Sequence, residues 1–326
     1  MKQKVLIILS VFFFASCDDI IIENTPENVF EVFWRTMNEN YVFFEEKGID
    51  WDAVYRTFAP RARNASEEEL LQIFREIIEP FPDRNVMIFT PEEWIMSWTP
   101  WDEDEEDLSW SPWSVLEYFG FEEKEVDGNV IVFENKEKGI IFFKPILFWG
   151  QHPHTIQYEM FLKSLDFSNG LIIDLTGNTV GNMTSFISAF FTGNQTIAYM
   201  QYKTGRGHND FGSKVPIVIQ GRGYVPDDIP IVIMTSRFTY NSANFVIYAL
   251  NDLRDNVTVV GLPTGGGGHI HRNVFLPNGW RLNFPGGGRY LTPSGISMEM
   301  EFEPDIRAIG NEAYEKAIEF LVGLQK

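Results

Sequence analysis

Three short apolar runs constrain the fold of this chain more than any other feature. They are apolar at almost every position and lie at residues 170–175, 229–234 and 257–261. Helical patterns alternate with them, near residues 155–165, 183–191 and 241–253. Strands that are apolar on both faces and alternate with helices form a sheet covered by helices on both sides. Residues 129–133 and 139–143 alternate like two paired strands. The sequence therefore predicts an α/β fold.

The part of the chain before residue 94 shows helical patterns instead. Thr25 and Pro26 provide an N-cap and a first-turn proline for one helix, and a second is expected over residues 50–58. Ser66, followed by Glu69, predicts a capping box that opens a third helix. We therefore expect a small helical domain at residues 26–93, ahead of an α/β domain at residues 129–326.

Residues 94–128, between these two parts, form a connector of unusual composition. Five of the nine tryptophans lie between Trp94 and Trp113, around an acidic run at residues 102–107. We expect the acidic run to be a solvated loop, because a calcium loop needs spaced ligands and a glycine turn that are missing here. The tryptophans are expected to cover the seam between the two domains; stacking on sugars or peptides is the alternative.

The first residues have the order of a secretory signal. Basic residues precede an apolar run at residues 5–14, which is too short to span a bilayer, and small residues follow it. The sequence Phe14-Ala15-Ser16-Cys17 matches a lipobox, in which the cysteine is lipidated after cleavage. We therefore expect a signal peptide at residues 1–16, a lipidated tether at 17–25 and a place in the bacterial cell envelope, at the outer membrane or the periplasmic face. A short N-terminal core helix is the alternative.

The net charge limits the classes of partner that we expect, and the cysteine content limits the chemistry. A formal charge of −20 and a pI near 4.6 leave no basic surface to neutralise phosphates, so we expect no nucleic acid and no membrane contact beyond the lipid anchor. Cys17 is the only cysteine, so the remaining chain has neither a disulfide nor thiol chemistry.

Five segments occur in an order that resembles a known family. They are residues 170–178, 229–244, 259–268, 276–280 and 303–306. Together they resemble serine peptidase family 41, the tail-specific or C-terminal-processing peptidases, in the tricorn-like lipoprotein type without a PDZ module. The resemblance covers residues 26–310 and implies a ClpP/crotonase-like mixed α/β core behind a small helical domain. It also implies a serine nucleophile on a strand-to-helix turn and a peptide or polypeptide ligand.

The residues that should carry the chemistry depart from the family pattern. Aligned on Tyr240 and Asn244, the family's nucleophile position holds Asn241, and Ser242 comes one residue late. A shift of one residue turns a helical side chain by roughly 100°, so Ser242 substitutes only if the turn is remodelled.

Other catalytic positions are also altered. Asn85 stands at the base position of tricorn-type members, where asparagine cannot take a proton, and Gly267 stands where other members carry a lysine. Gly181 is what remains of the oxyanion glycine pair, and Glu299 matches the supporting acid.

We therefore expect a proteolytically inactive homologue, with no cofactor, that binds peptide or polypeptide in the former substrate groove. An active serine endopeptidase using Ser242 and a histidine is the first alternative. A metal-binding envelope protein is the second, since His152 with His154, and His269 with His271, each place two imidazoles on one side of an extended chain. We assign no metal ligands, and expect His269 and His271 to be exposed positions on a strand beside a flexible loop at residues 265–268.

Overall fold

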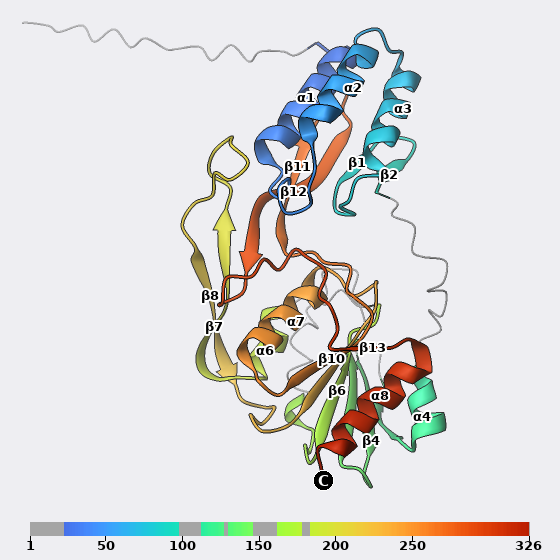
Figure 1. Ribbon diagram of the computed structural model, residues 1–326, viewed down its shortest axis with the longest axis vertical. Helices are drawn as coiled ribbons and strands as arrows, with labels where there is room; N and C mark the ends of the chain where they lie inside the picture. Colours follow the sequence, from blue (N-terminus) through green and yellow to red (C-terminus); the bar gives the residue numbers. More distant parts are fainter. Residues whose placement is uncertain (1–22, 98–111, 127–129, 146–161, 178–182, 326) are drawn as a thin grey trace, which may run out of the picture.

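The computed structural model describes residues 23–97, 112–126, 130–145, 162–177 and 183–325. Helices α1 to α3 occupy one end of the molecule, and a seven-stranded sheet with its helices occupies the other (Figure 1). A long hairpin of β11 and β12 runs from the helical end toward the other (Figure 1). The fold is thus mixed α/β with a helical N-terminal segment, as predicted.

The three helices at the N-terminal end begin where their capping residues predict. Helix α1 spans Pro26–Asn40, α2 spans Trp51–Ala62 and α3 spans Glu67–Ile78. The Thr25 hydroxyl accepts a hydrogen bond from the amide of Asn28, at 3.3 Å, and both bonds of the Ser66–Glu69 capping box form. Each cap satisfies amides that the first turn of a helix leaves without partners.

The seven-stranded sheet is parallel through its centre. Its order is β13-β10-β9-β6-β5-β4-β3, and the last two strands are antiparallel additions. The bounds are β3 Glu122–Val126, β4 Val130–Asn135, β5 Ile140–Pro145, β6 Gly170–Asp174, β9 Ile231–Thr235, β10 Val257–Gly261 and β13 Ile306–Arg307. The three predicted apolar runs therefore form three adjacent strands, β6, β9 and β10.

Helices cover both faces of this sheet. On one face lie α6 (Met183–Ser188) and α7 (Ser242–Leu253), and on the other α4 (Trp113–Phe119) and α8 (Gly310–Gly323). Neighbouring residues of a strand point to opposite faces, so Ile173 packs in the core beneath α7 and Ile172 in the core beneath α8. The helix expected near residues 155–165 lies mostly outside the described residues.

A second sheet joins the two ends of the molecule. Its order is β2-β1-β12-β7-β8, and β11 also pairs with β12. The bounds are β1 Met87–Phe89, β2 Trp94–Met96, β7 Thr192–Tyr202, β8 Val215–Arg222, β11 His269–Phe275 and β12 Arg281–Leu291. The β11–β12 hairpin places Leu276, Trp280, Leu282 and Phe284 in the core beneath α1 to α3. The helical segment therefore shares its core with residues that follow it by some 200 positions in the sequence.

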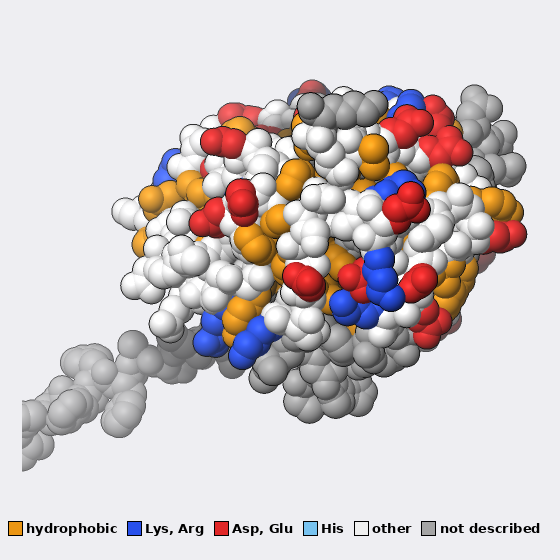
Figure 2. Space-filling view, turned by 90° about the horizontal axis from the view of Figure 1, so that it is seen from below, with side chains coloured by type: hydrophobic (Ala, Val, Ile, Leu, Met, Phe, Trp, Pro, Cys, Tyr) orange, Lys and Arg blue, Asp and Glu red, His pale blue; other side chains and the backbone are white. Residues whose placement is uncertain are grey.

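The connector and the chain start agree only in part with the expectations. Trp94 is 71% exposed and Trp113 is 46% exposed, so these two tryptophans do not seal a seam. Trp98, Trp101, Trp110, the acidic run and Cys17 lie outside the described residues. Within the described part, none of the helices has the length and apolar character needed to cross a bilayer. On the face seen in Figure 2, acidic and basic side chains are interspersed.

Candidate active site

Asn241 occupies a sharp turn between strand β9 and helix α7. Its φ of 54° and ψ of −117° make it the only non-glycine residue with a positive φ in the described part of the chain. Such a conformation costs roughly 1–3 kcal/mol and is typical of a turn that pushes one side chain out from the end of a sheet. The Asn241 amide donates to the Gly266 carbonyl at 2.8 Å, which fixes the turn against the glycine segment. The turn is therefore fixed in a conformation that presents one side chain at the end of the sheet, and the side chain that it presents is a carboxamide.

The turn is held from below by buried polar side chains. The Thr239 hydroxyl donates to the Leu175 carbonyl at 2.8 Å, and the Ser236 amide donates back to that hydroxyl at 3.0 Å. Asn244, fully buried in the first turns of α7, donates to the Met298 carbonyl at 2.8 Å. These bonds tie the turn to the ends of the strands and to the segment that carries Glu299.

A cavity of about 310 Å³ opens beside the turn. Its lining comprises Asn241, Ser242, Phe245, Gly267, Gly268, His269, His271 and Tyr290. Ser242 is the first residue of α7 and lines the same cavity as Asn241. The structure therefore brings together both candidate nucleophile positions and both histidines of β11.

The glycine segment at residues 265–268 is packed tightly, which contradicts the expected flexible loop. A β-carbon at Gly268 would lie 2.5 Å from the Met298 carbonyl, and one at Gly266 would lie 2.5 Å from the Glu299 carbonyl. A β-carbon at Gly267 would lie 2.5 Å from the Asn241 side-chain oxygen. Residue 267 thus faces Asn241, as expected if it marks the position where relatives place a lysine.

The amides of this segment are already in use. The Gly265 amide donates to the Thr239 carbonyl, the Gly267 amide to the Glu299 carbonyl and the Gly268 amide to the Glu299 carboxylate, each at 2.8 Å. An oxyanion hole needs amides that point at the reacting oxygen. These three amides instead satisfy acceptors of the protein itself.

His269 is buried, which contradicts the expectation of an exposed strand position. Its Nδ1 lies 2.6 Å from Glu299 Oε2, and both side chains are about 1% exposed. Burial alone would raise the pKa of Glu299, but the nearby His269 and Lys47 lower this pKa to about 2. Glu299 is therefore a charged carboxylate that orients the imidazole. His271 is exposed as expected, although its ring lines the cavity.

A lysine and a second carboxylate extend this buried pair. Lys47 Nζ lies 2.9 Å from Glu299 and 3.4 Å from Asp83, and the Tyr41 hydroxyl donates to Asp83 at 2.7 Å. Burial opposes the charged form of Lys47, yet the two carboxylates raise its pKa above the ordinary value. Sequence reasoning missed Lys47, because nothing in the sequence relates it to an acid 252 positions away.

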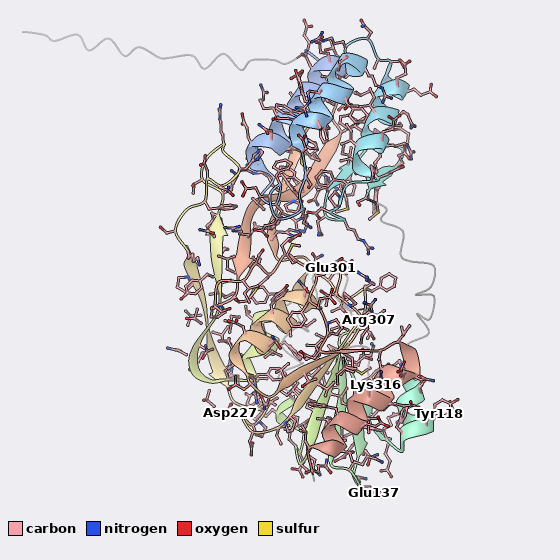
Figure 3. The ribbon with its side chains drawn as sticks, in the orientation of Figure 1. Tyr118, Glu137, Asp227, Glu301, Arg307 and Lys316 are labelled. Carbon is pink, nitrogen blue, oxygen red and sulfur yellow. The ribbon has the colours of Figure 1, made fainter. Side chains whose placement is uncertain are left out.

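Asn85 lines a different cavity from Asn241. This larger cavity, of about 540 Å³, is also lined by Asp83, Arg84, Glu299 and Glu301. Figure 3 shows Glu301 where the helical end meets the α/β part. Glu299 lines this cavity together with Asn85, and its carboxylate also contacts Gly268 and His269, which line the cavity beside Asn241. Gly181, His152 and His154 lie outside the described residues.

Comparisons with known families agree with the fold. Residues 151–308 match peptidase family S41, and residues 22–79 match the tricorn protease C1 domain. No curated protein matches the chain.

Solved structures match over nearly the whole length. A peptidase-like protein from Parabacteroides merdae is 27% identical with a TM-score of 0.77, covering 93% of this chain and 97% of that one. A lipoprotein from Streptococcus agalactiae is 18% identical with a TM-score of 0.55, covering 93% and 98%. The photosystem II D1 C-terminal processing protease is 12% identical with a TM-score of 0.51, covering 92% and 98%. The predicted resemblance to serine peptidase family 41 is confirmed, and its fold is that of this chain.

Proposed function

We propose, from this resemblance to peptidase family S41, that the protein binds an extended polypeptide at the turn of Asn241 without cleaving it. The observation that carries the proposal is Asn241 itself. It keeps the strained backbone of a nucleophile turn, with φ at 54°, while its side chain cannot attack a carbonyl as a serine hydroxyl does.

The engaged glycine amides support the absence of cleavage. Acyl transfer requires a nucleophile, a base and oxyanion donors around one point. His269 and Glu299 supply an oriented base, but the amides of Gly265, Gly267 and Gly268 already donate to protein acceptors. These residues therefore supply a base but neither a serine at the turn nor free glycine amides, and the oxyanion position expected at Gly181 lies outside the described residues.

An open strand edge and an exposed sheet face support polypeptide binding. Among the described strands, β11 pairs with β12 alone, so its other edge is available for an added strand. Direct cross-strand partners share a face, and one such row runs across four strands through Trp94, Phe89, Arg281 and Phe275. Trp94 and Phe275 are 71% and 72% exposed, and the Arg281 guanidinium lies 4.1 Å from the Phe89 ring centre. This row offers aromatic and cationic contacts on the same sheet, at the end of β11 opposite to the cavity.

The lipobox near the N-terminus supports a proposal for the cellular location. The lipobox at Cys17 predicts a lipid anchor, and one structural neighbour is a lipoprotein. We therefore place the protein at the bacterial cell envelope, where the lipid holds the binding site at the membrane surface. Detergent partitioning of the wild type and of Cys17→Ala tests the anchor, which predicts membrane association in the wild type only.

Binding is tested with fluorescein-labelled β-casein as an unfolded polypeptide probe, by fluorescence anisotropy. The wild type should bind, and Ser242→Trp, which fills the cavity, should weaken binding at least ~10-fold. Asn64→Trp, an exposed change in the helical segment, serves as the matched control. Equal binding by all three proteins would contradict a site at the turn.

The second candidate function is serine peptidase activity through Ser242. The shared cavity of Ser242 and His269 favours it. Labelling with a fluorophosphonate probe decides between the two functions: we expect none in the wild type and labelling in Asn241→Ser. Labelling of the wild type that Ser242→Ala abolishes would establish the active enzyme instead.

A further inference from the structure

The two histidines of β11 face each other through the same ring atom. Nε2 of His269 lies 3.2 Å from Nε2 of His271, and the rings meet at 81°. Both rings line the cavity of about 310 Å³ beside Asn241 and Ser242. The pair therefore presents two nitrogens at one wall of an accessible space.

The other nitrogen of each ring is already occupied. His269 Nδ1 lies 2.6 Å from the Glu299 carboxylate, which can only accept, so this nitrogen carries the proton. His271 Nδ1 lies 2.9 Å from the side-chain oxygen of Asn283, which likewise accepts. When both imidazoles are neutral and keep these bonds, both Nε2 atoms present lone pairs. Two lone pairs at 3.2 Å repel, and a metal ion or an added proton between them removes this repulsion.

We propose that His269 and His271 form a binding site for a borderline divalent metal ion, of which Zn²⁺ and Cu²⁺ are the best fits. Tetrahedral zinc with Zn–N bonds of about 2.0–2.1 Å holds its nitrogen ligands roughly 3.3–3.4 Å apart. The separation of 3.2 Å between the two Nε2 atoms needs almost no adjustment. Imidazole nitrogen suits both ions.

The groups that contact the two histidines are of the kind that supports metal-ligating histidines. A ligating histidine usually donates its second N–H to a carboxylate or an amide oxygen, which fixes the ring and raises its basicity. Glu299 and Asn283 do this for the two rings. Within the described residues, no cluster of three or more histidine, cysteine, aspartate or glutamate side chains is arranged to hold a metal. The remaining positions would thus fall to water and to Asn241 or Ser242, which share the cavity.

The test uses the whole chain with His152→Asn and His154→Asn as background, leaving three of the five histidines. Zn²⁺ is titrated by calorimetry at pH 7.5, and Cu²⁺ is followed by electron paramagnetic resonance. We expect one ion per chain, with coupling to two imidazole nitrogens. His271→Ala should lower the affinity at least ~10-fold, and Asn283→Leu by a similar factor, because the ring loses its orientation.

One matched change, His208→Asn, should leave the affinity within twofold, because it alters a histidine outside the cavity. Asn283→Asp keeps an acceptor for His271 Nδ1 and should preserve or strengthen binding where Asn283→Leu weakens it. His271 is exposed, so its replacement spares the core. Absence of binding in the background protein, or unchanged affinity in His271→Ala, would overturn the proposal and leave the pair as a hydrogen-bonded relay.

Discussion

Two buried carboxylates of this protein each pair with a lysine but have different surroundings. Asp174 lies 2.9 Å from Lys144 and accepts from the Tyr314 hydroxyl at 3.2 Å, while Glu299 lies 2.9 Å from Lys47. The first group joins β5, β6 and α8 within the α/β part and lines neither of the two cavities described above. Glu299 instead connects the helical segment with β11 and lies against the larger cavity.

The difference shows that a buried ion pair can serve a binding site when one of its partners lines a cavity. The second oxygen of Asp174 accepts from the Thr176 amide at 2.9 Å, so its partners are all structural. The second oxygen of Glu299 orients His269, whose remaining nitrogen faces the Asn241 cavity. Asp174 therefore stabilises the fold, and Glu299 also shapes a site.

The largest expected effects come from neutralising each carboxylate. Glu299→Gln and Asp174→Asn should each lower the free energy of unfolding by about 4 kcal/mol, because a buried lysine loses its charged partner. Only Glu299→Gln should also weaken polypeptide and zinc binding, since it removes the negative charge that His269 contacts. Denaturant unfolding and the binding assays above measure both quantities. Equal loss of binding in the Asp174→Asn protein would erase the distinction between the two groups.

Acid should lower the stability of the folded protein in a defined pH range, through protonation of Glu299. The pKa of Glu299 is lowered in the folded protein to about 2 from its ordinary value of 4.5. Its carboxylate therefore stabilises the fold fully above pH 4.5, and this stabilisation, about 3 kcal/mol, is lost as the pH falls toward 2. Unfolding curves between pH 6 and 2 should show this decline in the wild type and in Asp174→Asn. A decline of the same size in Glu299→Gln would assign it to other groups.

The smallest expected effects compare two buried tyrosines. The Tyr41 hydroxyl donates to Asp83 at 2.7 Å, and the Tyr314 hydroxyl donates to Asp174 at 3.2 Å. Hydrogen bonds to charged groups contribute about 1.5–3 kcal/mol, and shorter ones contribute more. Tyr41→Phe should cost about 2.5 kcal/mol and Tyr314→Phe about 1.5 kcal/mol in thermal unfolding. The reverse order would show that the Asp83 group is less rigid than its geometry implies.

Local signals predicted the elements whose stability is local. Thr25, Asp50 and Ser66 cap helices, and the three apolar runs became the parallel strands β6, β9 and β10. The turn before a helix start at Asn241 was also predicted, because a strand, a turn and a helix start leave a continuous pattern in the sequence. Predictions about exposure were weaker. His269 was expected on the surface, and the glycines before it were expected to be flexible.

Capping residues, apolar periodicity and the asparagine at the turn are thus properties that the sequence alone determines, since each depends on neighbours a few positions away. The pairing of His269 with Glu299, the contact of Lys47 with both carboxylates and the contact between the two histidine rings depend on the tertiary structure. So does the second sheet, in which β1 pairs with a strand nearly 200 positions later. The physical reason is that folding brings distant charges together where water is excluded, and only burial makes their pairing necessary.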